Sequence, residues 1–205
     1  MASKQVIKKV KKGAKKSFYD VEVPMTSVPV QLYSVDKESL DGRTIVLDLT
    51  RNLRGKSLLL KMKISLEGDK LKGTPFKIVM ASSNAQRIVR RGSDYSEDSF
   101  AFNCKDKNVR MKFLLVTRKR VSRTIRNILR QNAKKYLEDY MKSRTAEEVF
   151  TDITTNKIQK GLGLKLKKIY PLSASEVRWF EVLGDKVEEK VVKEEIEIEE
   201  EVSSK

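Results

Sequence analysis

One stretch of the chain alternates so regularly that it fits only an extended strand. In SLLLKMKISL (57–66), apolar side chains fall at every second position and polar ones between them. The apolar face holds Leu58, Leu60, Met62, Ile64 and Leu66. Because successive strand residues point to opposite sides, the pattern predicts a strand with one buried and one solvated face. Such half-buried strands are typical of antiparallel sheets.

Similar patterns predict further strands through the first half of the chain and one near its end. We expect strands at 18–24, 43–49 and 175–183, a hairpin of 98–104 with 108–117, and either a strand or a helix entry at 75–80. Five or six strands at short spacing in the first half favour a small β-barrel or a strongly curled antiparallel sheet.

The second half carries helical periodicity, so the predicted fold class is α+β, with helices packed on the sheet. The long helix is expected at 121–141. Its predicted apolar stripe is Val121, Ile125, Ile128, Leu129, Tyr136, Tyr140 and Met141. TAEE (145–148) is a capping box that starts another helix, and Pro171 predicts that the last helix ends at or before Tyr170. A short helix is expected at 84–91, with Ser82 or Ser83 as its N-cap.

Charge divides the chain into three expected parts: a basic disordered arm (1–17), one folded domain (18–183) and an acidic disordered tail (184–205). The net charge is +16, but the tail alone carries −5, so the rest carries +21. A body this basic indicates a polyanionic partner. We expect the tail to shield the basic surface before that partner is bound.

The titratable residues argue against an enzyme. There is no histidine, and Cys104 is the only cysteine, so a Cys/His zinc site is excluded and the commonest general base is missing. We expect no cofactor, no metal site and no small-molecule substrate. The single cysteine fits a reducing, cytoplasmic setting. No apolar run approaches the roughly 20 residues of a membrane span.

Basic residues gather in four places, and these are the candidate RNA-binding residues. They lie in the arm, in the short helix, along the long helix, where no acid occurs between Asp106 and Glu138, and near residue 166. The set is Lys8, Lys9, Lys11, Lys12, Lys15, Lys16, Arg87, Arg90, Arg91, Lys119, Arg120, Arg123, Arg126, Arg130, Lys134, Lys165, Lys167 and Lys168. We place Arg123, Arg126, Arg130 and Lys134 on the helix face opposite the apolar stripe. Several separate patches suit a protein embedded in a large folded RNA, held mainly through phosphates.

Other motifs give weaker evidence about function. GLGLKL (161–166) lacks the third glycine of a dinucleotide fingerprint, and Gly55-Lys56 lacks the upstream glycine of a phosphate-binding loop. Most aromatic residues sit at expected core positions, so we interpret them as packing. Trp179 and Phe180 must face opposite sides of their strand.

Three alternatives to a structural RNA-binding protein stay open at this point. A free RNA or DNA chaperone would bind any nucleic acid with a steep salt dependence. A carboxylate-and-metal nuclease would need acids that occur densely only in the tail. The helix at 121–141 could also lie on a membrane surface.

Three segments resemble one known family. KKGAKKSFYDVEVP (11–24), GRTIVLDLTRNL (42–53) and KKIYPLSASEVRWFEVL (167–183) are similar, in that order, to elements of the small-subunit ribosomal protein "three-a" family of archaea and eukaryotes. The chain length resembles that of archaeal members. Together the segments span roughly residues 10 to 183, and Ile169-Tyr170-Pro171-Leu172 is the most specific part.

The resemblance implies a non-enzymatic structural constituent of the small ribosomal subunit. It implies a barrel-like β core, binding to small-subunit rRNA at the platform near the mRNA exit, and a supporting role in translation. The implied neighbours are other platform proteins and, near the exit, mRNA.

Overall fold

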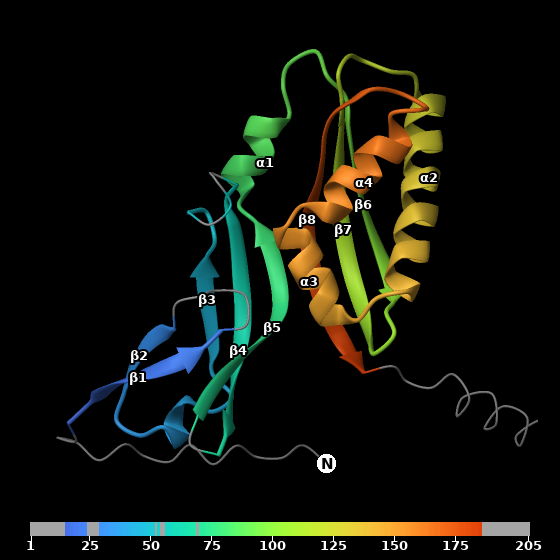
Figure 1. The fold of residues 1–205 in the computed structure, drawn as a ribbon. Coiled ribbons are helices and arrows are strands. Elements are labelled where there is room, and N and C mark those ends of the chain that lie inside the picture. Colours follow the sequence, from blue (N-terminus) through green and yellow to red (C-terminus); the bar gives the residue numbers. More distant parts are fainter. Residues whose placement is uncertain (1–14, 24–28, 52, 54–55, 69, 186–205) are drawn as a thin grey trace, which may run out of the picture. The chain divides into compact units, whose positions relative to one another are not determined.

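The computed structural model describes residues 15–23, 29–51, 53, 56–68 and 70–185 (Figure 1). Most of the predicted basic arm and nearly all of the predicted acidic tail lie outside these residues. Two compact units form, the first within residues 1–47 and 61–76 and the second within 48–60 and 77–205. The predicted domain boundaries at residues 17 and 183 stay predictions.

Eight strands and four α-helices form in the described residues, so the fold is α+β. The strands are β1 (Ser17–Glu22), β2 (Val30–Ser34), β3 (Thr44–Asp48), β4 (Leu58–Glu67), β5 (Lys70–Met80), β6 (Tyr95–Asn103), β7 (Lys107–Thr117) and β8 (Leu172–Asp185). The helices are α1 (Ser82–Ile88), α2 (Arg123–Lys142), α3 (Ala146–Thr154) and α4 (Lys157–Leu166), and a single 3₁₀ turn covers Glu38–Leu40.

The sheet is mixed and open, so the predicted barrel or strongly curled antiparallel sheet is wrong. Its pairing order is β2-β1-β5-β8-β7-β6, with β4 also pairing β5 and β3 pairing β4. β1 runs parallel to β5, and β8 enters between β5 and β7. This order is not that of a simple meander. Among the described strands, β2 and β6 are the two ends of the pairing order and do not pair with each other.

Strand β4, whose residues are divided between the two units, keeps the alternation seen in the sequence. Leu58, Leu60, Met62 and Ile64 of β4 are all buried, which confirms the predicted strand. Within the first unit, Val21, Leu40, Ile64 and Leu71 form a cluster against which Tyr19, Leu32, Ile45 and Leu66 pack.

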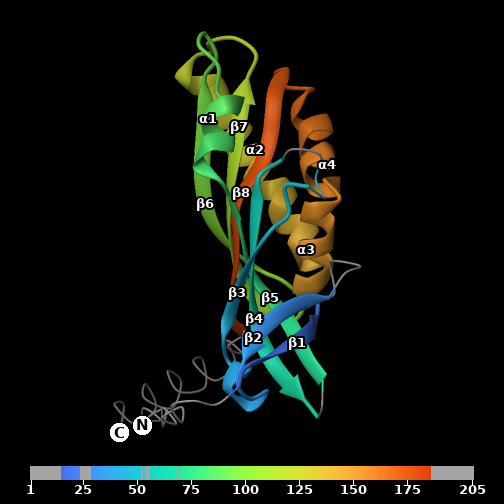
Figure 2. The same cartoon turned by 90° about the vertical axis from the view of Figure 1, so that its left-hand side faces the viewer.

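The second unit places three helices on one side of the sheet. The predicted hairpin forms as β6 and β7, and β8 pairs along β7. In Figures 1 and 2, α2, α3 and α4 all lie on the same side of these strands. Phe150 of α3 meets Phe180 of β8 edge-on, with 4.8 Å between ring centroids. Both side chains are fully buried, so this contact belongs to the core of the unit.

Helix ends follow the expected local rules in two of three places. The capping box at Thr145 and Glu148 is confirmed by reciprocal hydrogen bonds of 3.4 and 3.2 Å, and α4 ends at Leu166, before Tyr170. The predicted short helix is confirmed as α1, but its predicted cap and end are wrong: the N-cap is Ala81, without a side-chain hydrogen bond, and the helix ends at Ile88. Arg90 and Arg91 therefore lie beyond it.

Candidate nucleic-acid interface

The basic row of α2 runs along the side of the helix that meets β6. Arg123, Arg126 and Arg130 share a recess of about 260 Å³ with Tyr95, Ser96, Glu97 and Asn127. Arg130 and Lys134 line a second recess, of about 300 Å³, with Phe100, Asn127 and Gln131. The structure therefore brings the four predicted cations together.

The predicted placement of this row opposite the apolar stripe is wrong. The buried residues of α2 are Leu129, Ala133, Leu137 and Met141, whereas Ile128 is 41 % exposed. At 100° per residue this buried face is centred close to Arg126. The row consequently lies on the flank of the buried face, and Arg126 is itself half-buried. Its Nε is buried without a hydrogen-bond partner among the described residues.

One of the four cations has an acidic partner that lies far away in the sequence. Arg130 donates from Nε to Oδ2 of Asp98 at 2.8 Å, and its terminal nitrogen lies 2.5 Å from Oδ1. Asp98 is buried on β6, where Ser96 also donates to it. Lys134 lies over the ring of Phe100, 5.2 Å from its centroid. Arg123 and Arg126 form no ion pair within the described residues.

The other predicted cations are spread over separate surfaces. Lys119 and Arg120 are exposed just before α2. Arg87 is exposed on α1 and donates to Asn84 at 3.3 Å. Arg90, Arg91 and Lys168 are exposed, and Lys165 lies 5.0 Å from the ring centroid of Tyr136.

The arm residues are only partly described. Lys15 and Lys16 are exposed, and the Lys16 ammonium lies 5.6 Å from the ring centroid of Tyr33. Lys8, Lys9, Lys11 and Lys12 lie outside the described residues.

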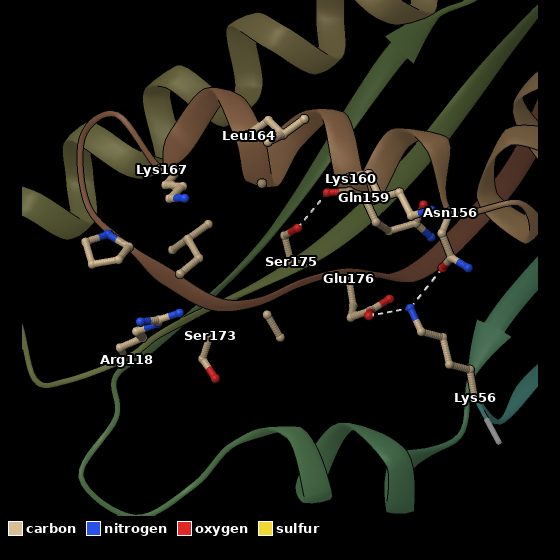
Figure 3. A pocket seen from close by; sticks show the side chains of 14 residues that line it. Lys56, Arg118, Asn156, Gln159, Lys160, Leu164, Lys167, Ser173, Ser175 and Glu176 are labelled. Atoms are coloured by element: carbon tan, nitrogen blue, oxygen red, sulfur yellow. Dashed lines mark hydrogen bonds and ion pairs between the residues drawn. The ribbon is translucent and has the colours of Figure 1, made fainter. Parts of the chain in front are cut away.

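A second basic surface was not predicted. The α4–β8 groove is a recess of about 850 Å³ lined by Lys56, Arg118, Asn156, Gln159, Lys160, Gly163, Leu164, Lys167 and residues 171–176. Figure 3 shows Lys167 and Arg118 toward one end, Lys56 and Asn156 toward the other, and Ser175 between them. Of the four cations that line the groove, only Lys167 was among the predicted RNA-binding residues.

Local sequence explains how the groove forms. Lys160, Leu164 and Lys167 follow Asn156 at spacings of three or four residues, so one face of α4 carries them. Pro171 then turns the chain back as β8, and Ser175 donates to the Gln159 carbonyl at 2.8 Å. Strand and helix are thereby held together along the groove.

Lys56 closes the far end of the groove. Its ammonium donates to Asn156 Oδ1 at 2.8 Å and to Glu176 Oε1 at 2.6 Å. Asn156 has a left-handed backbone, with φ of 60°, which asparagine tolerates better than most residues. No sequence pattern predicts a binding role for Lys56, because Gly55-Lys56 lacks the upstream glycine of a phosphate-binding loop. Arg118 begins the basic run 118–120, so that run could have identified it as a candidate.

Most aromatic residues are buried or half-buried, as expected, but three are not. Phe18, Tyr33 and Tyr95 are 68, 56 and 55 % exposed. Phe18 and Tyr33 are cross-strand partners whose ring centroids lie 4.9 Å apart. Phe180 is buried, whereas Trp179 is half-buried with Lys77 and Lys112 at 3.8 and 5.1 Å from its ring centroid. The adjacent pair does face opposite sides.

A strongly basic α+β fold with clustered arginines and lysines is typical of proteins that bind polyanions. The sequence matches the model of the Ribosomal S3Ae family over residues 4–186. The chain belongs to this family, and it is therefore a ribosomal protein of the small subunit and not an enzyme. The resemblance inferred from its three motifs is confirmed.

A curated relative supports the same assignment. The chain is 28 % identical over 181 residues to the small ribosomal subunit protein eS1 of Nanoarchaeum equitans (strain Kin4-M). The match covers 84 % of this chain and 91 % of the relative. Membership of the small subunit implies ribosomal RNA and ribosomal proteins as partners. No helix in the described ranges is long and apolar enough to cross a bilayer.

Proposed function

We propose that this protein is a structural constituent of the small-subunit platform near the mRNA exit, where it binds small-subunit rRNA and supports translation. Membership of the S3Ae family supports the ribosomal part of the proposal. The position on the platform rests on the family resemblance of residues 11–24, 42–53 and 167–183. Neighbouring platform proteins and mRNA near the exit are the proposed further partners.

The observation that carries the RNA-binding part is the row of cations on α2. Arg123, Arg126, Arg130 and Lys134 lie along about 17 Å of helix and face two recesses beside β6. Each lysine or arginine that neutralises a phosphate releases condensed counterions, so such a row gains affinity for RNA in a salt-dependent way. The planar guanidinium also suits bidentate contacts with phosphate oxygens.

Incorporation into small subunits tests the proposal. We would replace Arg123, Arg126 and Lys134 by Gln and keep Arg130, because its pair with Asp98 is structural. Small subunits depleted of the protein would be mixed with this variant and separated on a sucrose gradient. We expect wild-type protein to sediment with the subunit at one copy and the variant to be reduced at least tenfold.

A matched control removes the same charge elsewhere in the second unit. Lys105, Arg110 and Lys135 are exposed, so their replacement by Gln should leave incorporation within twofold of wild type. Wild-type protein that stays at the top of the gradient would contradict the ribosomal role and favour a free chaperone. Normal incorporation of the α2 variant would refute the assignment of this face. Cross-linking within assembled subunits would test the platform position.

A further inference from the structure

We propose that the α4–β8 groove holds a single strand of RNA by its phosphates, with Arg118, Lys160 and Lys167 as the phosphate-binding side chains. This proposal deepens the proposed function and rests on it. It assigns a contact to residues of which two, Arg118 and Lys160, lie outside the basic patches recognised in the sequence.

The charge balance of the groove favours a polyanion. Its only carboxylate among the described lining residues is Glu176, and Lys56 neutralises it at 2.6 Å. Within the described residues, no ion pair joins Arg118, Lys160 or Lys167 to an acid. The groove therefore presents three positive charges to solvent in a concave setting, where low-dielectric walls concentrate the field.

The spacing of the cations suits a chain of phosphates. Lys160 and Lys167 are seven residues apart on one face of α4, which is about 10 Å along the axis. At this spacing each lysine can reach a phosphate of its own through a charge-assisted N–H···O contact of about 2.7–2.9 Å. Arg118 sits beside the end of the groove, where its backbone N–H donates to the Pro171 carbonyl at 3.4 Å. In Figure 3 Lys160 lies between the two ends.

Apolar and hydroxyl groups between the cations suit the rest of a nucleotide. Leu164 lies between Lys160 and Lys167 on α4 and is 70 % exposed, and Pro171 is also exposed. These surfaces can cover a ribose or the face of a base, while Ser173 can donate to a phosphate oxygen or a 2′-hydroxyl. An A-form duplex offers its phosphates on the outside of a wide helix, so a recess of this size suits a single strand better.

Binding of single-stranded RNA by the full chain tests the groove. The probes are a labelled ten-nucleotide oligouridylate and an RNA hairpin, each titrated at several salt concentrations. The groove variant is Arg118→Gln with Lys160→Gln and Lys167→Gln. The control is the exposed triple Lys105→Gln, Arg110→Gln and Lys135→Gln, which removes the same charge.

We expect the groove variant to lose at least tenfold in affinity for the oligouridylate. Its slope of log K against log salt should fall by about 2, since each single-strand phosphate contributes about 0.7. The control should stay within threefold, and hairpin binding should change less than oligouridylate binding. Wild-type affinity and slope in the groove variant, or an equal loss in the control, would overturn the proposal.

A second variant tests the groove independently, in case the triple variant does not fold. Ser173 is exposed, so Ser173→Glu should leave the melting temperature unchanged and place a negative charge among the proposed phosphates. We expect it to weaken oligouridylate binding at least threefold. An unchanged affinity would contradict the groove, whatever the triple variant does.

The source of the strand and the parent proposal are tested separately. Subunits containing wild-type protein and either 4-thiouridine-labelled rRNA or a labelled mRNA fragment would be irradiated, and cross-linked peptides mapped. Cross-links to residues 160–173 identify the source, and their absence from both arms counts against the groove. If wild-type protein fails to join small subunits, the proposed function fails. If the groove variant loses incorporation but keeps oligouridylate binding, the groove holds a protein and this proposal is wrong.

Discussion

Arg130 on α2 and Asp98 on β6 form a two-point ion pair, with Nε to Oδ2 at 2.8 Å and a terminal nitrogen 2.5 Å from Oδ1. The carboxylate side chain is only 6 % exposed, whereas that of Arg130 is 46 % exposed. One member of a row that looks entirely cationic in the sequence thus holds the helix to the sheet. The remaining members stay available for a ligand.

Replacing Arg130 by Gln should destabilise the protein by about 1–3 kcal/mol, because it leaves a buried carboxylate without its charged donor. Arg123→Gln is the control and should change the free energy of unfolding by less than about 0.5 kcal/mol, since Arg123 is exposed. Urea unfolding measures both. Equal stability of the two variants would show that the pair contributes nothing to the fold.

Gly161 of α4 lies where any Cβ would overlap the hydroxyl of Tyr136 on α2. We expect Gly161→Ala to lower the free energy of unfolding, because overpacking costs about 1–3 kcal/mol and the gain in helix propensity is at most about 1 kcal/mol. Adding Tyr136→Phe should recover most of the loss, because it removes the overlapping oxygen. Gly163→Ala should cost less than Gly161→Ala, since its Cβ would lie 3.3 Å from Ser175 Oγ, a tight contact that a small shift of the serine can relieve. A destabilised double variant would contradict the packing argument.

Lys56 holds the far end of the α4–β8 groove through Glu176 and Asn156. Lys56→Met should destabilise the protein by about 1–3 kcal/mol, because the Glu176 side chain is only 13 % exposed and loses its charged donor. Glu176→Gln in the same chain should restore part of the loss. Lys160→Met, at an exposed position, should stay within about 0.5 kcal/mol. Thermal melts at neutral pH compare the three variants.

The phenol of Tyr140 should lose its proton at a higher pH than an ordinary tyrosine. Burial, helped by its hydrogen bond of 2.7 Å to the carboxylate of Asp152, raises the pKa of Tyr140 from 10.0 to about 12. The folded state favours the neutral phenol, so the resulting stabilisation is complete below about pH 10 and is lost as pH rises toward 12. Absorbance titration near 295 nm should show a tyrosine transition near pH 12 that Tyr140→Phe removes. A transition near pH 10 for all six tyrosines would contradict this.

Much of the secondary structure follows from short-range patterns. The alternation of 57–66 predicts β4, the capping box at Thr145 predicts the start of α3, and Pro171 predicts that α4 ends before Tyr170. Each of these signals acts within a few residues, through side-chain direction, a local hydrogen bond or a steric clash. Two exceptions are β2, which no pattern predicted, and α1, where two serines looked like caps but Ala81 holds that position.

The candidate interface was predictable only in part. Arg123, Arg126, Arg130 and Lys134 share a helix side because of their spacing, and they do lie together. The prediction of which side was wrong, because it counted Ile128 as buried and left out Ala133 and Leu137. Those two residues are buried by the sheet and neighbouring helices, which the helix sequence alone does not describe.

By itself, then, the sequence determined most strand and helix segments, though not β2, together with the excess of positive charge and the family motifs, since these are properties of neighbouring residues or of simple sums. Only the tertiary structure decided the strand order, the partner of Arg130 and the groove that joins Lys56, Arg118 and Lys160. These depend on contacts between residues that lie tens to more than a hundred positions apart. Such contacts form when many weak packing interactions together favour one arrangement of the chain. Their combined free energy cannot be read from any short stretch of sequence.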